Sequence, residues 1–536
     1  MRNRQRAIIG SMSPAARRSK TSALSLTGED LTPEQFFKVV HEKWPVRLSP
    51  QAARRMNAAH RVIQRVLTYP DPVYGVTTGF GKLADQRISL SDIAQLQLNL
   101  VRSHAAGVGN PLTPEETRGL LLLRANVLAR GHSGVRPLVT EYLLTLLNRN
   151  ILPIVPCRGS VGASGDLAPL AHLALVLIGE GEALVQNRRL PGRTALAQAG
   201  LKPLQLQAKE GLSLVNGTQA MLSLGLLALH RCERLADTAD VAGALSVEAL
   251  KGTPVAFEPR IQKLRPYRGQ QTVAANLSAL MTGSAIRASH VGCPRVQDAY
   301  SLRCMPQVHG AVRDALDHVR AALEIEINSV TDNPLVFSDR NEVVSGGNFH
   351  GQPLGLVLDY LAIAMTELAS ISERRIERLI NPEYGDLPPF LSPQPGLHSG
   401  FMLAQVTAAA LTSENKVLSH PASVDSIPTS GNQEDHVSMG MGSALKLRQV
   451  VSNVEYILAI ELMCAAQGVD FHRPLQPGMG SRLALQYIRR RVARLTEDRV
   501  LAIDIERIRG LVADGILSGI LSAIRATTST RRRSTS

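Results

Sequence analysis

The feature that most limits the possible folds of this chain is a repeated signal for the start of an α-helix. Residues 32–35 (Thr-Pro-Glu-Gln) and 113–116 (Thr-Pro-Glu-Glu) each offer an N-cap threonine, a proline at the first helical position and a side chain that can reach back to the cap. Ser49-Pro50 predicts a third start, for a helix that continues to about Leu67. Such signals favour a fold built from helices.

Apolar residues at helical spacing predict several longer helices. In residues 309–330, Val312, Leu316 and Val319 recur at intervals of three and four, as on one face of a helix. Further helices are predicted over residues 352–382, 434–468 and 482–496. Strand signals such as Val343-Val344 are few and short. We therefore predict a mainly α protein, a bundle of long helices whose connecting loops carry the function.

Charge divides the chain into a body and two basic ends. Of the net charge of +14, six basic residues lie within residues 1–20 and four within 521–536, with no acidic residue in either stretch. We predict a basic disordered tail over 1–25, an N-terminal domain over 26–220, a long-helix bundle over 221–520 and a second basic tail over 521–536. No stacking aromatic residues accompany the basic ends, which argues against a nucleic-acid partner.

The cysteines and the apolar runs indicate a cytoplasmic protein. The five cysteines are odd in number and include no Cys-x-x-Cys pair, which fits reduced thiols. The strongest apolar stretch, from Leu167 to Ile178, is too short to cross a bilayer. We expect no membrane partner and no secretory signal.

Residues 159–170 are the most reactive-looking stretch of the chain. Ala163, Ser164 and Gly165 are small, Asp166 follows at once, and the amide nitrogen of Gly165 is unshielded by a side chain. A backbone of this composition can fold tightly enough to react with itself. Taken alone, however, the same residues are typical of a flexible turn.

Two further stretches carry polar groups suited to binding an amino acid. Gln297, Tyr300 and Arg303 are spaced by three, so a helix over 296–304 would place them on one face, and Arg303 is suited to a bidentate contact with a carboxylate. A surface polar face explains the same spacing. Tyr74 lies in a loop rich in glycine and proline and could serve as a general base, although a lone loop tyrosine is more often a surface residue.

Three other loops complete the set of candidates. Asn216-Gly217 is by itself a turn signal, and residues 346–351, which contain Phe349, lack the glycine spacing of a dinucleotide site. Glu434 lies with a second carboxylate and a histidine at the expected start of a helix, where acidic residues oppose the helix dipole. No zinc-type spacing is present, so we expect no metal.

All six stretches occur in the order found in the aromatic amino acid ammonia-lyase family, which the chain resembles over nearly its whole length outside the tails. The resemblance implies a long-helix bundle of the ammonia-lyase/fumarase-like type, assembled as a homotetramer with active sites shared between subunits. It also implies that Ala163, Ser164 and Gly165 cyclise and dehydrate into 4-methylidene-imidazole-5-one, with no external cofactor.

The resemblance assigns a role to each remaining candidate. It makes Tyr74 the base that removes a β-proton and Arg303 the group that holds the substrate carboxylate. It makes Asn216 and Tyr300 the residues that position the amine and the modified serine, and Gln297 and Phe349 residues of the pocket.

The substrate depends on three residues. Ser103-His104 and Glu434 are similar to the histidine-specific members, which form trans-urocanate, whereas phenylalanine and tyrosine lyases tend to carry glutamine at the position of Glu434. An imidazole has two nitrogens to satisfy, and His104 and Glu434 offer polar partners for them. A phenylalanine or tyrosine ammonia-lyase, or a 2,3-aminomutase, stays open as an alternative, as does a nucleic-acid-binding protein on a scaffold that has lost its activity.

Overall fold

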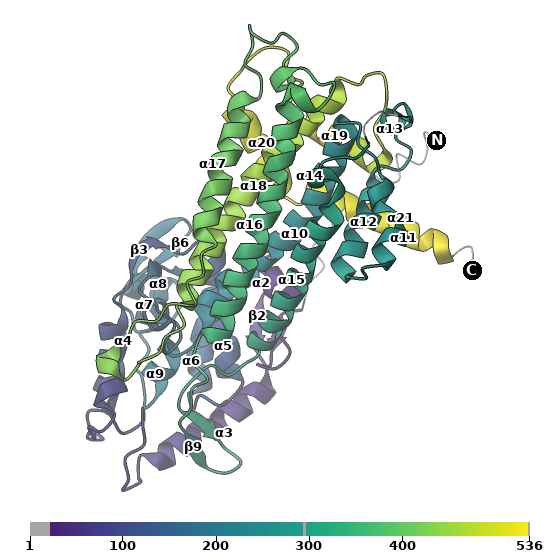
Figure 1. Cartoon of the computed structure of the whole chain (residues 1–536). Helices are drawn as coiled ribbons and strands as arrows, with labels where there is room; N and C mark the ends of the chain where they lie inside the picture. Colours follow the sequence, from purple (N-terminus) through teal and green to yellow (C-terminus); the bar gives the residue numbers. More distant parts are fainter. Residues whose placement is uncertain (1–21, 293–295, 534–536) are drawn as a thin grey trace.

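Long helices run side by side through the computed structural model, which describes residues 22–292 and 296–533 (Figure 1). They are α10 (Gln219–Ala249), α15 (Met305–Glu326), α16 (Gln352–Ile380), α17 (Met402–Leu418) and α18 (Gly440–Asp470). Helix α18 is buried along most of its length and packs against both α10 and α16. The mainly helical fold predicted from the sequence is confirmed.

A lobe of shorter elements covers one end of the bundle (Figure 1). Its helices are α2 (Pro33–His41), α3 (Pro50–Val66), α4 (Ile93–His104), α5 (Pro114–Ala129), α6 (Pro137–Asn148), α7 (Leu167–Leu177), α8 (Gly192–Gln198) and α9 (Glu210–Val215). Helix α5 is buried on every side beyond its first turn, and it passes between the lobe and α10.

The strands are short and form small separate sheets. β1 (Leu24–Leu26) pairs in parallel with β2 (Val46–Leu48), and β3 (Val108–Pro111) pairs antiparallel with β5 (Pro156–Arg158). β4 (Leu152–Pro153), β6 (Glu182–Val185) and β7 (Arg188–Pro191) form an antiparallel sheet of order β4-β6-β7. β8 (Leu335–Phe337) and β9 (Glu342–Val344) form a hairpin, which contains the predicted Val343-Val344 strand.

The far end of the bundle carries the remaining helices. They are α11 (Pro259–Lys263), α12 (Arg268–Leu280), α13 (Ala285–Ala288), α14 (Tyr300–Arg303), α19 (Met479–Arg489), α20 (Leu501–Ala513) and α21 (Ile516–Arg533). Single 3₁₀ turns occupy Gly81–Leu83, Val255–Phe257, Pro382–Tyr384, Pro389–Leu391 and Ser430–Asn432.

The predicted helix starts are confirmed, and one of the longer predictions is corrected. Thr32 and Thr113 each form a full capping box, and the Ser49 hydroxyl caps α3. The helix expected from residue 434 begins instead at Gly440. The stretch before it is held in an irregular loop, because the backbones of Thr429 and Glu434 pair with each other as in an antiparallel bridge.

Ordered structure reaches into both segments that the sequence assigned to basic tails. Residues 1–21 of the first tail lie outside the described residues, but β1 begins at Leu24 and pairs with β2. At the other end, helix α21 extends to Arg533. Its residues Leu517, Leu521 and Ile524 are buried, because their spacing of three and four turns one apolar face toward the molecule.

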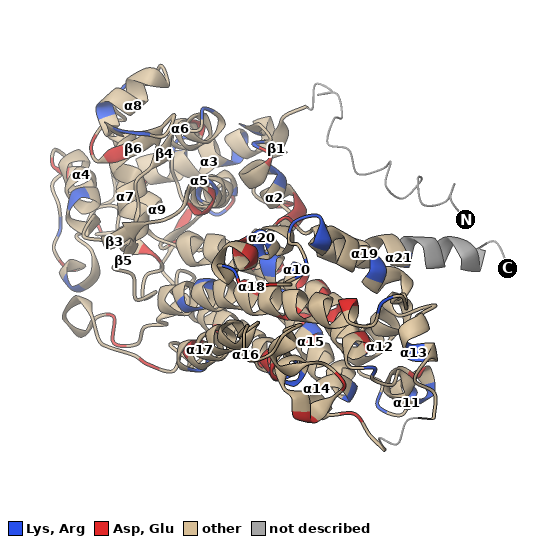
Figure 2. Cartoon of the chain, turned by 90° about the horizontal axis from the view of Figure 1, so that it is seen from above, with Lys and Arg blue, Asp and Glu red and all other residues tan. Residues whose placement is uncertain are grey.

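Two helices are long and apolar enough to span a membrane by length and composition alone, Gln352–Ile380 and Gly440–Asp470. Their most apolar windows are 61% and 83% buried inside the protein, as expected of the core helices of a soluble protein. Basic and acidic residues are interspersed along the described chain (Figure 2). The cysteines at 157, 232, 304 and 464 are free thiols.

Candidate active site

The Ala163–Gly165 segment lies at the junction of the lobe and the bundle, just before α7. Gly165 adopts a φ of +74° and faces Gly217, so a Cβ at position 165 would collide with the Gly217 carbonyl. Ala163 is only 4% exposed. The close approach explains why residue 165 is a glycine.

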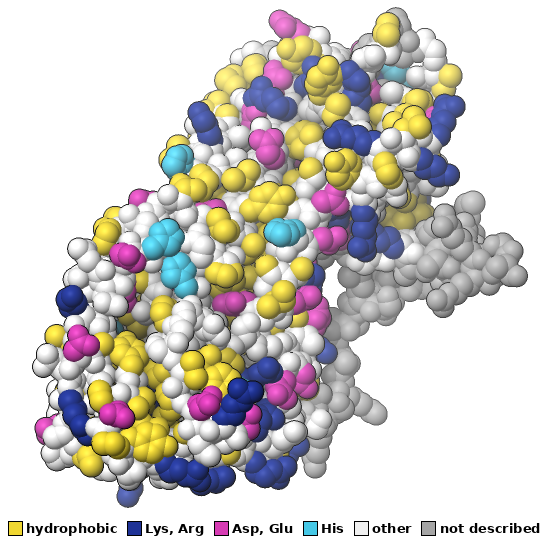
Figure 3. Space-filling model, turned by 60° about the horizontal axis from the view of Figure 1, so that its bottom comes forward, with side chains coloured by type: hydrophobic (Ala, Val, Ile, Leu, Met, Phe, Trp, Pro, Cys, Tyr) yellow, Lys and Arg dark blue, Asp and Glu magenta, His cyan; other side chains and the backbone are white. Residues whose placement is uncertain are grey.

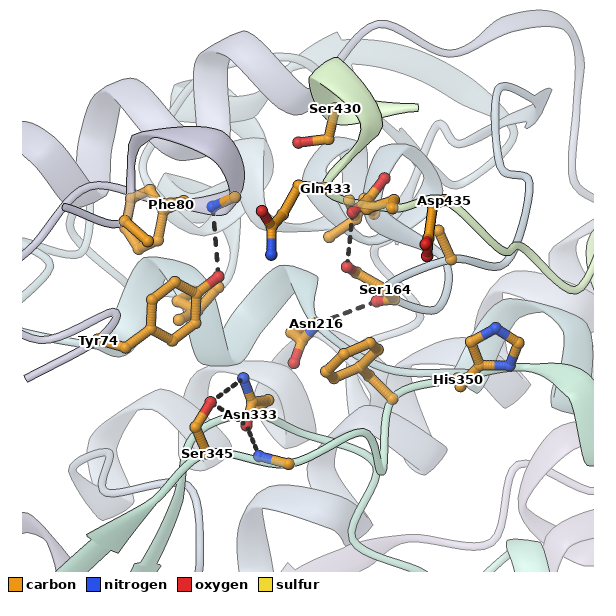
Figure 4. A pocket seen from close by; sticks show the side chains of 18 of the residues that line it. Tyr74, Phe80, Ser164, Asn216, Asn333, Ser345, His350, Ser430, Gln433 and Asp435 are labelled. Carbon is orange, nitrogen blue, oxygen red and sulfur yellow. Dashed lines mark hydrogen bonds between the residues drawn. The ribbon is translucent and has the colours of Figure 1, made fainter. Parts of the chain in front are cut away.

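The Ser164 side chain and carbonyl are both held by residues distant in sequence. The Ser164 hydroxyl donates to Glu434 Oε1 at 2.8 Å, and Asn216 Nδ2 donates to the Ser164 carbonyl at 2.9 Å (Figure 4). The second oxygen of Glu434 accepts from the Thr429 hydroxyl at 2.6 Å. Two predicted site residues, Asn216 and Glu434, therefore meet at Ser164.

Glu434 acts here as a hydrogen-bond acceptor and not as a helix-end charge. Because α18 begins six residues later, the interpretation of Glu434 as a residue that opposes the helix dipole is wrong. The half-buried carboxylate instead faces the cavity beside Ser164.

Asp166 is fully buried directly behind the segment. Its Oδ1 accepts from the Ser160 hydroxyl at 2.9 Å, and its Oδ2 accepts from the Met221 backbone N–H at 2.9 Å. Its own N–H donates to the Gly217 carbonyl at 2.6 Å. Burial raises the pKa of the Asp166 carboxyl to about 6, against the opposite effect of these donors.

His104 approaches the same cavity from the last turn of α4. Its Nδ1 lies 3.1 Å from the Ser103 hydroxyl, which also donates to the Leu100 carbonyl. Burial lowers the pKa of His104, with Glu434 opposing that shift. A neutral imidazole in this place can donate from one nitrogen and accept at the other. Ser103 itself does not line the cavity but orients the His104 ring.

Tyr74 lies on the opposite side of the cavity, on the loop between α3 and α4. Its hydroxyl oxygen accepts from the Gly81 backbone N–H at 3.3 Å, which fixes the position of the phenol in the cavity (Figure 4). The loop folds back on itself through a bridge between Thr78 and Arg87.

These side chains enclose a cavity of about 490 Å³, large enough for an amino acid. Phe349 lines it from the loop before α16, and Asn333 Oδ1 accepts the Gly346 N–H of that loop at 2.7 Å. Tyr74, Asn216 and Ser164 point into the space at the centre of Figure 4.

Several residues of this cavity were not predicted from the sequence, among them Phe80, Leu212, Asn333, Ser345, His350, Gln433, Asp435 and His436. Adjacency in sequence could have found four of them, because they neighbour Phe349 or Glu434. Nothing in the sequence around Asn333 or Leu212 indicates that either reaches the cavity, since both are brought there by tertiary packing.

Gln297, Tyr300 and Arg303 do not join this cavity. They lie at the far end of the bundle, where Gln297 and its neighbour Asp298 line a separate cavity of about 200 Å³ (Figure 1). Tyr300 is 71% exposed, and the Arg303 guanidinium stacks on its ring at 4.5 Å.

The helix predicted over 296–304 is also wrong, because α14 covers only Tyr300–Arg303. The Asp298 carboxylate accepts the Thr253 N–H at 2.6 Å, and its backbone carbonyl accepts from Arg303 at 3.0 Å. These bonds hold the residues before Tyr300 in an extended conformation. Gln297 therefore shares no helix face with the other two residues.

The residues present fit a prosthetic group made from Ala163, Ser164 and Gly165. Such a ring requires small side chains on both sides of the serine and an unshielded amide nitrogen, and positions 163 and 165 meet both conditions. The Ser164 hydroxyl, which would leave as water, is held by a carboxylate, and the Ser164 carbonyl, which would remain on the ring, is held by an amide, so the serine is fixed from both sides.

Comparison with known proteins agrees with this geometry. Residues 31–490 match the family model described as aromatic amino acid lyase. The chain is 55% identical to a histidine ammonia-lyase of Gloeobacter violaceus over 507 residues, covering 94% of this chain and 98% of that protein.

Solved structures give the same result. A histidine ammonia-lyase of Trypanosoma cruzi is 45% identical, with a TM-score of 0.87 over 94% of this chain and 96% of that one. A tyrosine aminomutase of Streptomyces globisporus is 40% identical, with a TM-score of 0.88 over 94% of this chain and 99% of that one. The overall fold is thus shared by lyases and aminomutases.

Proposed function

Because the chain belongs to the aromatic amino acid lyase family, we propose that it eliminates ammonia from L-histidine, without oxidation, to give trans-urocanate. One observation carries the choice of substrate: His104 and Glu434, two polar groups, face the cavity beside Ser164. A phenyl substrate would leave His104 without a polar partner, and also Glu434 Oε1 once the Ser164 hydroxyl has left as water, at a cost of about 1–3 kcal/mol each. The reaction belongs to histidine degradation.

The chemistry requires a base and an activated leaving group on one bound substrate. A β-proton of an amino acid is weakly acidic, and an amine leaves poorly. The 4-methylidene-imidazole-5-one formed from Ala163, Ser164 and Gly165 supplies an electrophile that turns the amine into a better leaving group. No external cofactor and no metal take part.

Each of the other cavity residues has its own role in the proposed reaction. Tyr74 takes the β-proton, and its position across the cavity from Ser164 supports that role. Asn216 holds the Ser164 carbonyl through its Nδ2. His104 and Glu434 bind the imidazole, Ser103 orients His104, and Phe349 packs against the substrate.

The carboxylate of the substrate is held by residues of a neighbouring subunit. We assign that contact to Arg303, with Tyr300 and Gln297 beside it, in a homotetramer whose active sites are shared. Their separation from Ser164 within one chain supports this arrangement.

The outer surface of the bundle offers a face for such assembly. Leu356, Tyr360 and Ile363 are exposed at helical spacing on α16, and Leu403 and Val406 are exposed on the adjacent α17. Hydrophobic side chains are scattered over the bundle and gather in a recess of the lower half of the molecule (Figure 3). Exposed apolar residues in a row are typical of an interface.

We place the protein in the cytoplasm. The free thiols at the described cysteine positions support a reducing compartment. The scattered arrangement of basic and acidic residues supports a small-molecule substrate and not a nucleic-acid partner.

A product assay tests the proposed function. Purified enzyme given L-histidine should form urocanate, followed by its ultraviolet absorbance, and should form little cinnamate from phenylalanine or coumarate from tyrosine. Ser164→Ala should lose activity by a factor on the order of 10³ or more, with an unchanged circular dichroism spectrum. Cinnamate, coumarate or a β-amino acid as the main product would instead identify a phenylalanine or tyrosine lyase or a 2,3-aminomutase.

A further inference from the structure

Arg124 is a fully buried arginine that lies directly behind the active-site turn. It projects from α5, which is buried around it, and none of its side chain is exposed. Its Nη1 donates to the Asn216 backbone carbonyl at 2.6 Å and to Gln219 Oε1 at 2.9 Å. Nη1 therefore contacts a residue on each side of Gly217 in the sequence, Asn216 and Gln219.

Within the described part of the chain, no carboxylate neutralises this guanidinium through a hydrogen bond. The nearby Asp332 is bonded to the buried amine of Lys209 at 3.0 Å, so the cluster contains two cations and one anion. Arg124 Nε and Nη2 have no hydrogen-bond partner among the described residues. Burial lowers the pKa of Arg124 to about 10, which still leaves it a cation at neutral pH. A cation buried in this way is costly, which points to a role beyond packing.

The turn that Arg124 holds contacts both sides of the reactive peptide. Asn216 Nδ2 donates to the Ser164 carbonyl, and the Gly217 carbonyl accepts the Asp166 N–H. Gly217 has a φ of +147°, and a Cβ there would lie 2.8 Å from Arg124 Nη1. The guanidinium therefore packs against the side of Gly217 where a side chain would stand.

The Asn216 carboxamide depends on its backbone for orientation. Its Oδ1 is buried and has no hydrogen-bond partner among the described residues. The bond from Nδ2 to Ser164 and the bond from Arg124 to the Asn216 carbonyl fix this residue on the side of the cavity, and its N–H donates back to the Leu212 carbonyl of α9 at 2.9 Å. Without Arg124, the turn would lose the contact that sets its distance from Ser164 and Gly165.

We propose that Arg124 is a positioning residue for the self-conversion of Ala163, Ser164 and Gly165: by clamping the Asn216-Gly217 turn, it holds the reactive peptide in the conformation that cyclises. The proposal rests on the proposed function, because it concerns the conversion that function requires. The step itself forms a bond from the Gly165 nitrogen to the Ala163 carbonyl carbon and releases two water molecules. One water takes the Ala163 carbonyl oxygen with the hydrogens of the Gly165 and Ser164 nitrogens, and the other takes the Ser164 hydroxyl with the hydrogen of the Ser164 Cα.

Arg118 provides a matched control on the same helix. It is also buried, and its guanidinium donates to the backbone carbonyls of Val39, Val40 and Leu147 at 2.7–3.0 Å, away from the active site. Arg118→Met therefore removes a buried arginine with several carbonyl contacts but leaves the Asn216-Gly217 turn untouched.

The test follows the loss of two water molecules by intact-mass spectrometry, with the full chain made by cell-free synthesis and sampled over time. Arg124→Met should convert at least about tenfold more slowly than Arg118→Met, at a comparable melting temperature. Arg124→Lys keeps the positive charge but loses the planar guanidinium, so it should convert at an intermediate rate. It should also fold if Arg124→Met fails to fold.

The outcomes separate the two proposals. Conversion of Arg124→Met and Arg124→Lys at the wild-type rate overturns the role of Arg124. Equal slowing of Arg124→Met and Arg118→Met, in proportion to lost stability, overturns it too. A wild-type chain that never loses the two water molecules overturns the proposed function instead.

Discussion

The two ends of the long-helix bundle differ in how much of a binding site each one forms within a single chain. At the lobe end, Ser164 is surrounded by Glu434, Asn216 and His104, which come from three separate parts of the chain. At the far end, Tyr300 is mostly exposed, and the contacts that Arg303 makes with the described residues include the Tyr300 ring and the Asp298 carbonyl.

This difference supports the proposal that each active site combines residues of more than one subunit. The lobe end fixes a reactive peptide by hydrogen bonds on every side, which requires burial and a rigid surrounding fold. The far end presents an arginine and a tyrosine on a short, exposed helix, where a carboxylate of a substrate held by another copy can approach. In the proposed homotetramer, the far end of one subunit would complete the lobe end of another.

Co-assembly of two inactive variants is the strongest test of this division. A chain carrying Ser164→Ala and a chain carrying Arg303→Ala should each be inactive, yet co-expression should restore lyase activity, because some sites combine an intact lobe end with an intact far end. Urocanate formation by purified mixed oligomers, distinguished by two affinity tags, measures the effect.

The matched control combines two variants that both alter the lobe end. Ser164→Ala co-expressed with Asn216→Ala should stay inactive, because every lobe end then carries one of the two defects. Activity in this control, or none in the first mixture, would contradict the division between subunits.

The titration of Asp166 offers a test of how burial of this carboxyl affects the stability of the protein. Its pKa rises from 3.8 to about 6 in the folded protein, so between these values the folded chain holds a proton that the unfolded chain has released. Its contribution to the free energy of unfolding is therefore lost as pH rises through this window, by about 3 kcal/mol in total.

Denaturant unfolding of wild type and Asp166→Asn across this pH range measures the contribution. The difference between the two proteins should change through the window and level off above it. Ser160→Ala, which removes a donor that favours the carboxylate, should extend the window to higher pH. A constant difference would show that Asp166 titrates alike in the folded and unfolded chains.

His104→Leu should lower kcat/KM for histidine by about 10- to 100-fold, because the imidazole loses a buried polar partner worth about 1–3 kcal/mol. Steady-state kinetics on histidine give the value. Ser103→Ala should show a smaller loss, since Ser103 acts through the orientation of the His104 ring. Unchanged kinetics in His104→Leu would remove it from substrate recognition.

Thr429→Val should have the smallest effect, a rise in KM of about fivefold, corresponding to one hydrogen bond of about 1 kcal/mol. The Thr429 hydroxyl donates to the oxygen of Glu434 that does not contact Ser164, so it orients the carboxylate. Thr429→Ser keeps that hydroxyl and should keep the wild-type KM. If both variants behave alike, the Thr429 hydroxyl does not orient Glu434.

The helices were predicted with more success than the loops. Capping residues such as Thr32 and Thr113 act on neighbouring backbone groups, so their effect is visible in the local sequence. The start of α18 and the extent of α14 were missed because bonds to distant residues decide them: Ser164 and Thr429 hold Glu434, and Thr253 holds Asp298. A residue such as Asn333 reaches the cavity through packing alone and leaves no local signal.

Local sequence features were enough to predict the helical fold, the Ala163–Gly165 segment and the resemblance to ammonia-lyases, because helix periodicity, caps and small residues act over a few neighbouring positions. Three findings required the folded chain: Asn216 and Glu434 meet at Ser164, Arg124 is buried behind them, and Arg303 lies at the other end of the molecule. Those facts depend on contacts between residues far apart in the chain, which are set by the packing of whole helices.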